Sequence, residues 1–127
     1  RHRRRVDAGS VRLLFNIVPE AAVYLSERTL ADIARSTVFN ARPDALCVSG
    51  LTAGAATDTS ALHTVKDAAP GVPVFANTGV KDSTVGEQLE IADGAVVGTF
   101  FKRDGVFENP VDADRVAALM AIVRQLR

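Results

Sequence analysis

The chain has 127 residues, with 15 basic and 15 acidic side chains, and this length suits a single domain over residues 1–127. Hydrophobic residues make up 47% and charged residues 24%, which is the composition of a globular protein with a buried core. The balanced charge excludes a strongly basic nucleic-acid binder, and the lack of any apolar run near ~18 residues excludes an integral membrane protein.

Apolar, β-branched runs alternate with segments of helical period four times along the chain. The first run, 11–18, predicts a strand that ends at Pro19. A helix follows from about Thr29, which is capped in the manner of a capping box by Asp32 three residues later. The face of this helix that we expect to be buried recurs at helical spacing: Leu30, Ile33, Ala34, Thr37, Val38 and Ala41.

The later units repeat this plan. Strands are predicted at 44–49, 73–77 and 94–98. The helices between them begin after Thr57 or Asp58 and at about Ser83. A longer connection covers 100–110, and a last helix starts from a cap at Asp112. The inward face expected of that helix is Val116, Leu119, Met120, Val123 and Leu126.

The strands are almost continuously apolar, which is typical of a parallel sheet covered by helices. Four strand–helix units in strict alternation define the α/β class. Two architectures fit: a small open sheet with helices on both faces, or the second half of a (β/α)8 barrel. A whole barrel needs about 250 residues, so this chain has room for only four of its eight units. We expect four parallel β–α units equivalent to the C-terminal half of a TIM barrel, strands five to eight.

In a parallel α/β sheet, ligands bind at the carboxyl ends of the strands. The third and fourth predicted strands end in Asn77-Thr78-Gly79 and Gly98-Thr99. Glycines at such ends either simply turn the chain or let backbone N–H groups approach a phosphate. We expect Asn16, Ser49 and Asn77, which stand at strand ends, to point toward the same ligand.

Lys102 follows directly and is a candidate counter-charge for a phosphate, because charge-assisted bonds to phosphate are strong. The alternative is a solvated loop, and Asp104-Gly105 beside it has the pattern of a plain turn. The basic cluster Arg1–Arg5 has no interleaved aromatic residues, so we expect an exposed helix end rather than a nucleic-acid site.

The usual catalytic and metal-binding signatures are missing from the sequence. There is no Walker loop, no G-x-G-x-x-G after a strand and no G-x-S-x-G elbow, and we expect no bound cofactor. His2 and His63 have no ligand spacing around them, so we expect no metal site. Cys47, the single cysteine, forms no internal disulfide and favours a cytoplasmic setting. Because the chain starts at Arg1 rather than Met, we expect it to be part of a longer protein.

Several tracts together resemble the BtpA/SgcQ-like family over almost the whole chain. The most specific are Val74–Val80 (VFANTGV), Ile91–Gly94 (IADG) and Val97–Phe107 (VGTFFKRDGVF), continuing to Arg115. The similarity extends upstream through Ala45–Gly50, Thr52 and Gly54, and Val65-Lys66. The resemblance implies a TIM-type barrel related to phosphate-binding barrels, of which this chain matches the C-terminal half. The family takes its name from a photosystem I biogenesis factor, and some bacterial members accompany sugar-uptake systems.

The chain departs from the family pattern after its first strand. Members commonly carry an acidic residue there, followed by a lysine–histidine pair, where this chain has Asn16, Glu20 and Ala21. A titratable cluster at the barrel mouth is thereby altered, so the resemblance implies no catalytic acid or base here.

Two main functions remain open. The first is an enzyme-like barrel that binds a phosphorylated small molecule, a sugar or nucleoside derivative, on Thr78, Gly79, Gly98 and Thr99. The second is a non-enzymatic assembly or stability factor, as the family name suggests. A third, an independent signalling domain with an open sheet, lacks the acidic pocket that it needs. For the half-barrel, we expect the first and last strands to be unpaired edges and the chain to associate with itself or with an N-terminal half.

Overall fold

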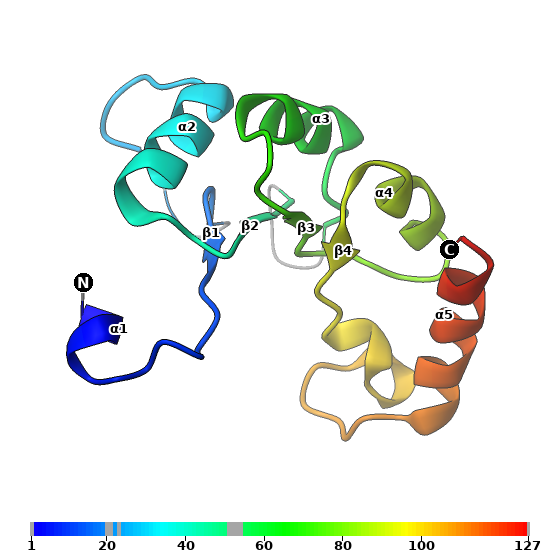
Figure 1. Cartoon of the computed structure of the whole chain (residues 1–127). Helices are drawn as coiled ribbons and strands as arrows, with labels where there is room; N and C mark the ends of the chain where they lie inside the picture. The colour runs from blue at the N-terminus through cyan, green and yellow to red at the C-terminus, as the bar shows by residue number, and fades with distance from the viewer. Residues whose placement is uncertain (1, 20–21, 23, 51–54, 127) are drawn as a thin grey trace.

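The computed structural model describes residues 2–19, 22, 24–50 and 55–126 (Figure 1). Four parallel strands form one sheet in the order β1-β2-β3-β4, with neighbours in the sheet consecutive in the chain. The strands are β1 (Leu14–Asn16), β2 (Ala45–Val48), β3 (Val74–Ala76) and β4 (Gly94–Ala95). This confirms the α/β class and the four strand–helix units expected from the sequence.

Helices connect the strands and follow the last one. The described helices are α1 (His2–Arg5), α2 (Leu30–Ala41), α3 (Thr59–Ala68), α4 (Val85–Ile91) and α5 (Ala113–Gln125), with the short 3-10 turns η1 (Thr99–Phe101) and η2 (Arg103–Gly105) after β4. Figure 1 shows α2 to α5 following one another along the same side of the sheet. Helices on one face of a sequentially ordered parallel sheet are the arrangement of consecutive barrel units, whereas a doubly wound sheet covers both faces.

Alternate residues of each strand supply the core between the sheet and the helices. Leu46, Val48 and Val74 are fully buried there against Leu62 and Val65 of α3. The intervening residues form a row across the opposite face, in the register Asn16, Cys47, Phe75 and Gly94. A Cβ on Gly94 would lie 1.9 Å from the Phe75 ring, so glycine is needed there for the ring to cover β4.

Three of the expected helix starts are confirmed by side-chain caps, whereas α4, expected from about Ser83, begins at Val85 without one. The Thr29 hydroxyl accepts a hydrogen bond from the Asp32 N–H at 3.1 Å and donates to the Asp32 carboxylate at 2.6 Å. Asp58 caps α3 through the Ser60 N–H, and Asp112 caps α5. These caps depend only on residues within one turn, which is why the sequence predicts them.

The prediction is wrong in two details, one about the buried helix faces and one about the strand lengths. Ala41 is exposed because it is the last residue of α2, and Leu126 lies beyond the end of α5 and is 44% exposed. The strands expected at 11–18 and 94–98 pair only over Leu14–Asn16 and Gly94–Ala95. Each lies at a sheet edge with one neighbouring strand, so only residues opposite that neighbour are held in the ladder.

At the opposite end from the carboxyl ends of the strands, Asp44 joins α1 to the sheet. Its carboxylate accepts hydrogen bonds from the Leu13 N–H at 2.8 Å, from Arg12 at 3.0 Å and from Arg3 at 2.8 Å. The Leu13 N–H, then Arg12 and Arg3, lower the pKa of Asp44 from its usual 3.8 to about 2. The basic cluster at the start of the chain therefore has a structural role through Arg3.

We expect Asp44→Asn to destabilise the chain at neutral pH and to remove part of its acid sensitivity. Because the folded-state pKa is lowered, the ionised carboxylate stabilises the fold above pH 4, and this contribution is lost as the pH falls from about 4 to about 2. Urea unfolding across this range should show the variant and the parent converging at pH 2. The exposed Asp67→Asn serves as the matched control, and an unchanged gap between D44N and parent at pH 7 and pH 2 would contradict the prediction.

Candidate functional site

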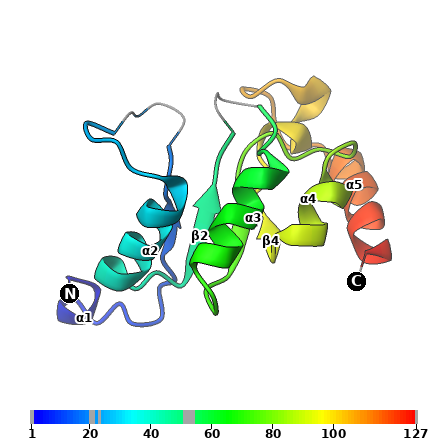
Figure 2. The ribbon, with the colours of Figure 1, turned by 90° about the horizontal axis from the view of Figure 1, so that it is seen from above.

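The carboxyl ends of the first three strands place three predicted residues side by side. The Ser49 hydroxyl oxygen accepts a hydrogen bond from the Asn16 side-chain amide at 2.8 Å and from the Asn77 amide at 3.0 Å. Figure 2 shows that the arrow of β2 points to this end of the molecule, away from α1. We call Asn16, Ser49 and Asn77 the amide row.

The loops after β2 and β3 pack backbone against backbone beside the amide row. Gly79 has a φ of +63°, and a Cβ there would lie 2.4 Å from the Ala55 carbonyl carbon and the Ala56 nitrogen. The Thr78 hydroxyl accepts from the Gly50 N–H at 2.6 Å, which joins the same two loops. Gly79 is thus required both for its left-handed conformation and for the close approach.

A cavity of about 440 Å³ lies between the loop after β3 and the segment after β4. Its walls include five of the predicted site residues: Asn77, Thr78, Gly79, Gly98 and Thr99. Three other predicted residues, Asn16, Ser49 and Lys102, are not among its lining. The lining also includes Phe100, Phe107 and Arg115, together with Val80, Lys81, Val96 and Gly105.

Gly98 and Thr99 form the start of η1, on the cavity side of β4. Within the described ranges, the backbone N–H groups of Gly98, Thr99 and Phe100 make no backbone hydrogen bond, while the Gly98 and Thr99 carbonyls close the turn onto Phe101 and Lys102. A Cβ on Gly98 would meet nothing within 4 Å. The open space at the Cβ position of Gly98 and the nearby N–H groups without a backbone partner among the described residues are both features of a backbone anion site.

Lys102 lies in the segment that joins η1 to η2 and bridges Val111 through its backbone. The Arg103 N–H donates to the Pro110 carbonyl at 3.0 Å, so the two arms of this segment are tied together. Asp104 and Gly105 both have positive φ, at 58° and 68°, and make the turn expected from the sequence.

Arg115, in the first turn of α5, belongs to the site and was missed as a site residue from the sequence. Its Nε donates to the Phe100 carbonyl at 2.6 Å, and its guanidinium carbon lies 4.6 Å from the centre of the Phe100 ring. The sequence carried one signal for it: a cation in the first turn of a helix opposes the helix dipole, so another interaction must favour it there.

The groups with shifted pKa values lie away from this cavity. Burial alone raises the pKa of the Cys47 thiol, consistent with an inert, buried side chain. For Asp93, burial acts to raise the pKa, but bonds from Lys66 at 2.8 Å and the Val74 N–H at 2.7 Å outweigh it and lower the pKa. These carboxylates tie elements together and supply no acid–base pair at the strand ends.

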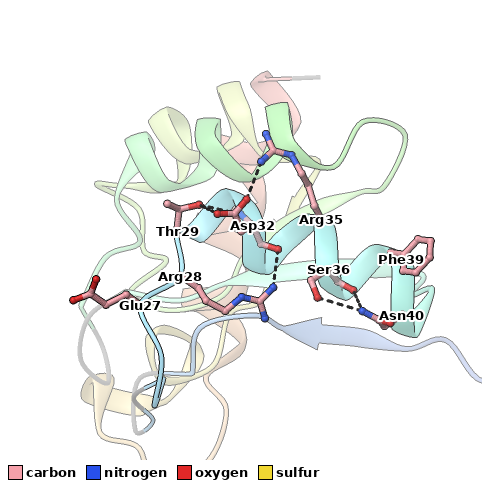
Figure 3. A pocket seen from close by; sticks show the side chains of 8 residues that line it. All are labelled: Glu27, Arg28, Thr29, Asp32, Arg35, Ser36, Phe39 and Asn40. Carbon is pink, nitrogen blue, oxygen red and sulfur yellow. Dashed lines mark hydrogen bonds and ion pairs between the residues drawn. The ribbon is translucent and has the colours of Figure 1, made fainter.

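A larger, open groove of about 1000 Å³ lies along the outer face of α2 (Figure 3). Its polar side chains already bond one another: Asp32 accepts from Thr29 and from Arg35 at 3.3 Å, and Asn40 donates to Ser36. Phe39, which is 83% exposed, is its one large apolar side chain. Because these polar side chains already bond one another and the groove is open to solvent, it is a less suitable ligand site than the strand-end cavity.

The described residues contain neither a cluster of metal-ligating side chains nor a membrane-spanning helix. No group of three or more His, Cys, Asp or Glu side chains among them could hold a metal ion. No helix among them is both long and apolar enough to cross a membrane.

The fold and the site define a parallel α/β protein built from successive barrel units, with a cavity at the carboxyl ends of its strands whose lining includes glycines. The chain belongs to the BtpA family, whose model matches residues 1–125. Glu20 and Ala21, which depart from the family pattern, and Thr52 and Gly54, which follow it, lie outside the described residues.

Relatives from bacteria and archaea match almost the whole chain. The sgc region protein SgcQ of Escherichia coli is 58% identical over 127 residues, which is all of this chain and 47% of that protein. An uncharacterised protein of Thermococcus kodakarensis is 31% identical over 98% of the chain and 46% of its own length. The photosystem I biogenesis protein BtpA of Synechocystis is 27% identical over 94% of the chain and 42% of its own length. The chain thus spans about half the length of the curated relatives it matches, consistent with half of a barrel.

We expect Gly79→Ala to destabilise the chain by about 1–3 kcal/mol, because the new Cβ meets the Ala55–Ala56 backbone and the left-handed conformation disfavours it. The matched control is Gly86→Ala. Gly86 lies inside α4, where a Cβ meets nothing within 4 Å, and alanine should stabilise the helix by about 0.5–1 kcal/mol. Urea unfolding of both variants measures this, and equal stabilities would contradict the close packing of the two loops.

Proposed function

We propose that this chain binds a phosphorylated small molecule, a sugar or nucleoside phosphate, at the strand-end cavity. The observation that carries the proposal is a cavity of ligand size lined by Gly79, Gly98 and Thr99, in which the backbone N–H groups of Gly98 and Thr99 have no backbone hydrogen-bond partner among the described residues. Glycine at position 98 leaves the backbone open to an anion without a side chain in the way.

The amide row supports a ligand that carries hydroxyl groups. Ser49 accepts from two amides and keeps its own proton, so its hydroxyl is free to donate. The side-chain carbonyl oxygens of Asn16 and Asn77 remain as acceptors. Since Asn77 also lines the cavity, a phosphate held at Gly98 leaves the rest of the molecule directed toward this row.

We expect inorganic phosphate at millimolar concentration to shift the backbone amide NMR signals of Gly79, Gly98 and Thr99 more than those of the basic cluster Arg3–Arg5. A hexose monophosphate should shift the same amides and, in addition, the side-chain amides of Asn16 and Asn77. Chloride at equal ionic strength is the control. Signals that do not move, or that move only at Arg3–Arg5, would contradict this function.

The second candidate is a non-enzymatic assembly factor. It is favoured by the name of the Synechocystis relative, a photosystem I biogenesis protein. In that case the strand-end cavity would be silent toward both phosphate and sugar phosphate. The same titration therefore separates the two candidates.

We also propose that the sheet is completed by further β–α units, from an N-terminal half or from a second copy, in a cytoplasmic protein. Strands β1 and β4 each pair with one neighbour, and Leu14 of β1 is 46% exposed. The relatives have about twice the length of this chain, which is enough for the remaining units.

We expect the 127-residue chain to form dimers or larger species in light scattering, because its two sheet edges present unpaired N–H and C=O groups. Leu14→Lys should reduce this association by placing a charge on edge strand β1, whereas Leu25→Lys, at an exposed position away from the sheet, should not. A stable monomer that refolds rapidly and cooperatively would count against the incomplete sheet.

A further inference from the structure

Two cations line the cavity, the exposed Lys81 and the half-buried Arg115, and of these two only Arg115 has its side chain held by contacts with described neighbours. Arg115 donates from Nε to the Phe100 carbonyl at 2.6 Å, and the Phe100 ring lies against its guanidinium, 4.6 Å from the guanidinium carbon. These two contacts fix the plane of the group. They use one of its five N–H groups and leave the two terminal nitrogens, Nη1 and Nη2, to bind something else.

Arg115 has no counter-charge within the part of the chain that the structure describes. The ion pairs there involve Arg3, Arg12, Arg35 and Lys66. The carboxylate of Asp112, the N-cap residue of α5, accepts hydrogen bonds from the backbone N–H groups of Asp114 and Arg115 at 3.0 and 3.4 Å. A half-buried guanidinium without a carboxylate, in the wall of a cavity, is suited to bind an anion.

The position of Arg115 within α5 also favours a role in binding an anion. It is the third residue of α5, where the dipole of a helix disfavours a positive charge. Neither capping nor helix stability therefore explains an arginine there. Gly105, with a φ of +68°, lies beside it: a Cβ on this residue would be in ordinary van der Waals contact with Nη2, at 3.6 Å.

We propose that Arg115, rather than Lys102, is the cation that binds the phosphate of the ligand, held in place by Phe100. This inference rests on the proposed function and assigns its charged contact. The planar fork of Arg115 matches two phosphate oxygens, while the Gly98 and Thr99 N–H groups approach the phosphate from η1. Lys102 is not part of the lining of the cavity and is held to Val111 through its backbone.

The test compares three charge-removing variants by NMR titration with inorganic phosphate and with a hexose monophosphate. R115Q removes the proposed contact, K102Q removes the alternative cation, and R124Q removes an exposed charge from the last turn of the same helix. We expect R115Q to weaken the affinity measured at the Gly98 amide by about tenfold to a hundredfold, the usual loss for a hydrogen bond to a charged group. K102Q and R124Q should stay within about twofold of the parent, as peripheral charges do.

R115K keeps the charge but loses the fork and the contact to the Phe100 carbonyl, so we expect an affinity between those of the parent and R115Q. If the unfolding midpoint shows that R115Q has lost its fold, R115K replaces it as the test variant. Parent-like affinity in R115Q, or a loss in K102Q as large as in R115Q, overturns the assignment to Arg115 while phosphate binding at Gly98 stands. No shift at Gly98 in the parent chain overturns the proposed function and this inference together.

Discussion

The parallel register between β2 and β3 is the constraint on which the site depends. Leu46, Cys47 and Val48 pair with Val74, Phe75 and Ala76, so the residues that follow, Ser49 and Asn77, end their strands at the same level. Their hydrogen bond and the contact of Gly79 with the Ala55–Ala56 backbone follow from that register. A slip of β3 by one residue would turn Asn77 to the helix-covered face, away from Ser49, and would put Phe75 into the core. The core packing of β2 and β3 therefore also positions the polar rim.

Most of the fold follows from local patterns, and the parts that do not are those set by distant residues. Caps at Thr29, Asp58 and Asp112 depend on side chains within one turn, and the sequence predicts them. The ends of β1 and β4 depend on how much of β2 and β3 lies opposite them, which the period of apolar residues does not record. The order of the strands and the single helix-covered face decide between the two architectures that the pattern had left open.

In the candidate site, too, some features follow from local sequence and others from residues distant in the chain. Gly79 and Gly98 look alike in the sequence, each at the end of a strand, yet the structure separates their roles. Gly79 is required by its conformation and by its close packing, whereas Gly98 has open space around it and unbonded N–H groups beside it. Lys102 is the cation that follows Gly98 and Thr99 in the sequence, but Arg115 reaches the cavity because α5 folds back against η1. Proximity along the chain therefore indicated a segment beside the cavity but not the arginine that lines it.

The two parts of the proposed ligand depend differently on what surrounds this chain. The proposed phosphate contacts come from the segments that follow β3 and β4, from η1 and from α5, all within the described residues. The amide row runs the other way, toward the edge strand β1, where Asn16 is exposed while Ser49 and Asn77 are half-buried. Protein groups that recognise the rest of the proposed ligand therefore have room to approach from beyond β1. We infer that phosphate recognition is a property of these four units, whereas selectivity among phosphorylated molecules needs the units that complete the sheet.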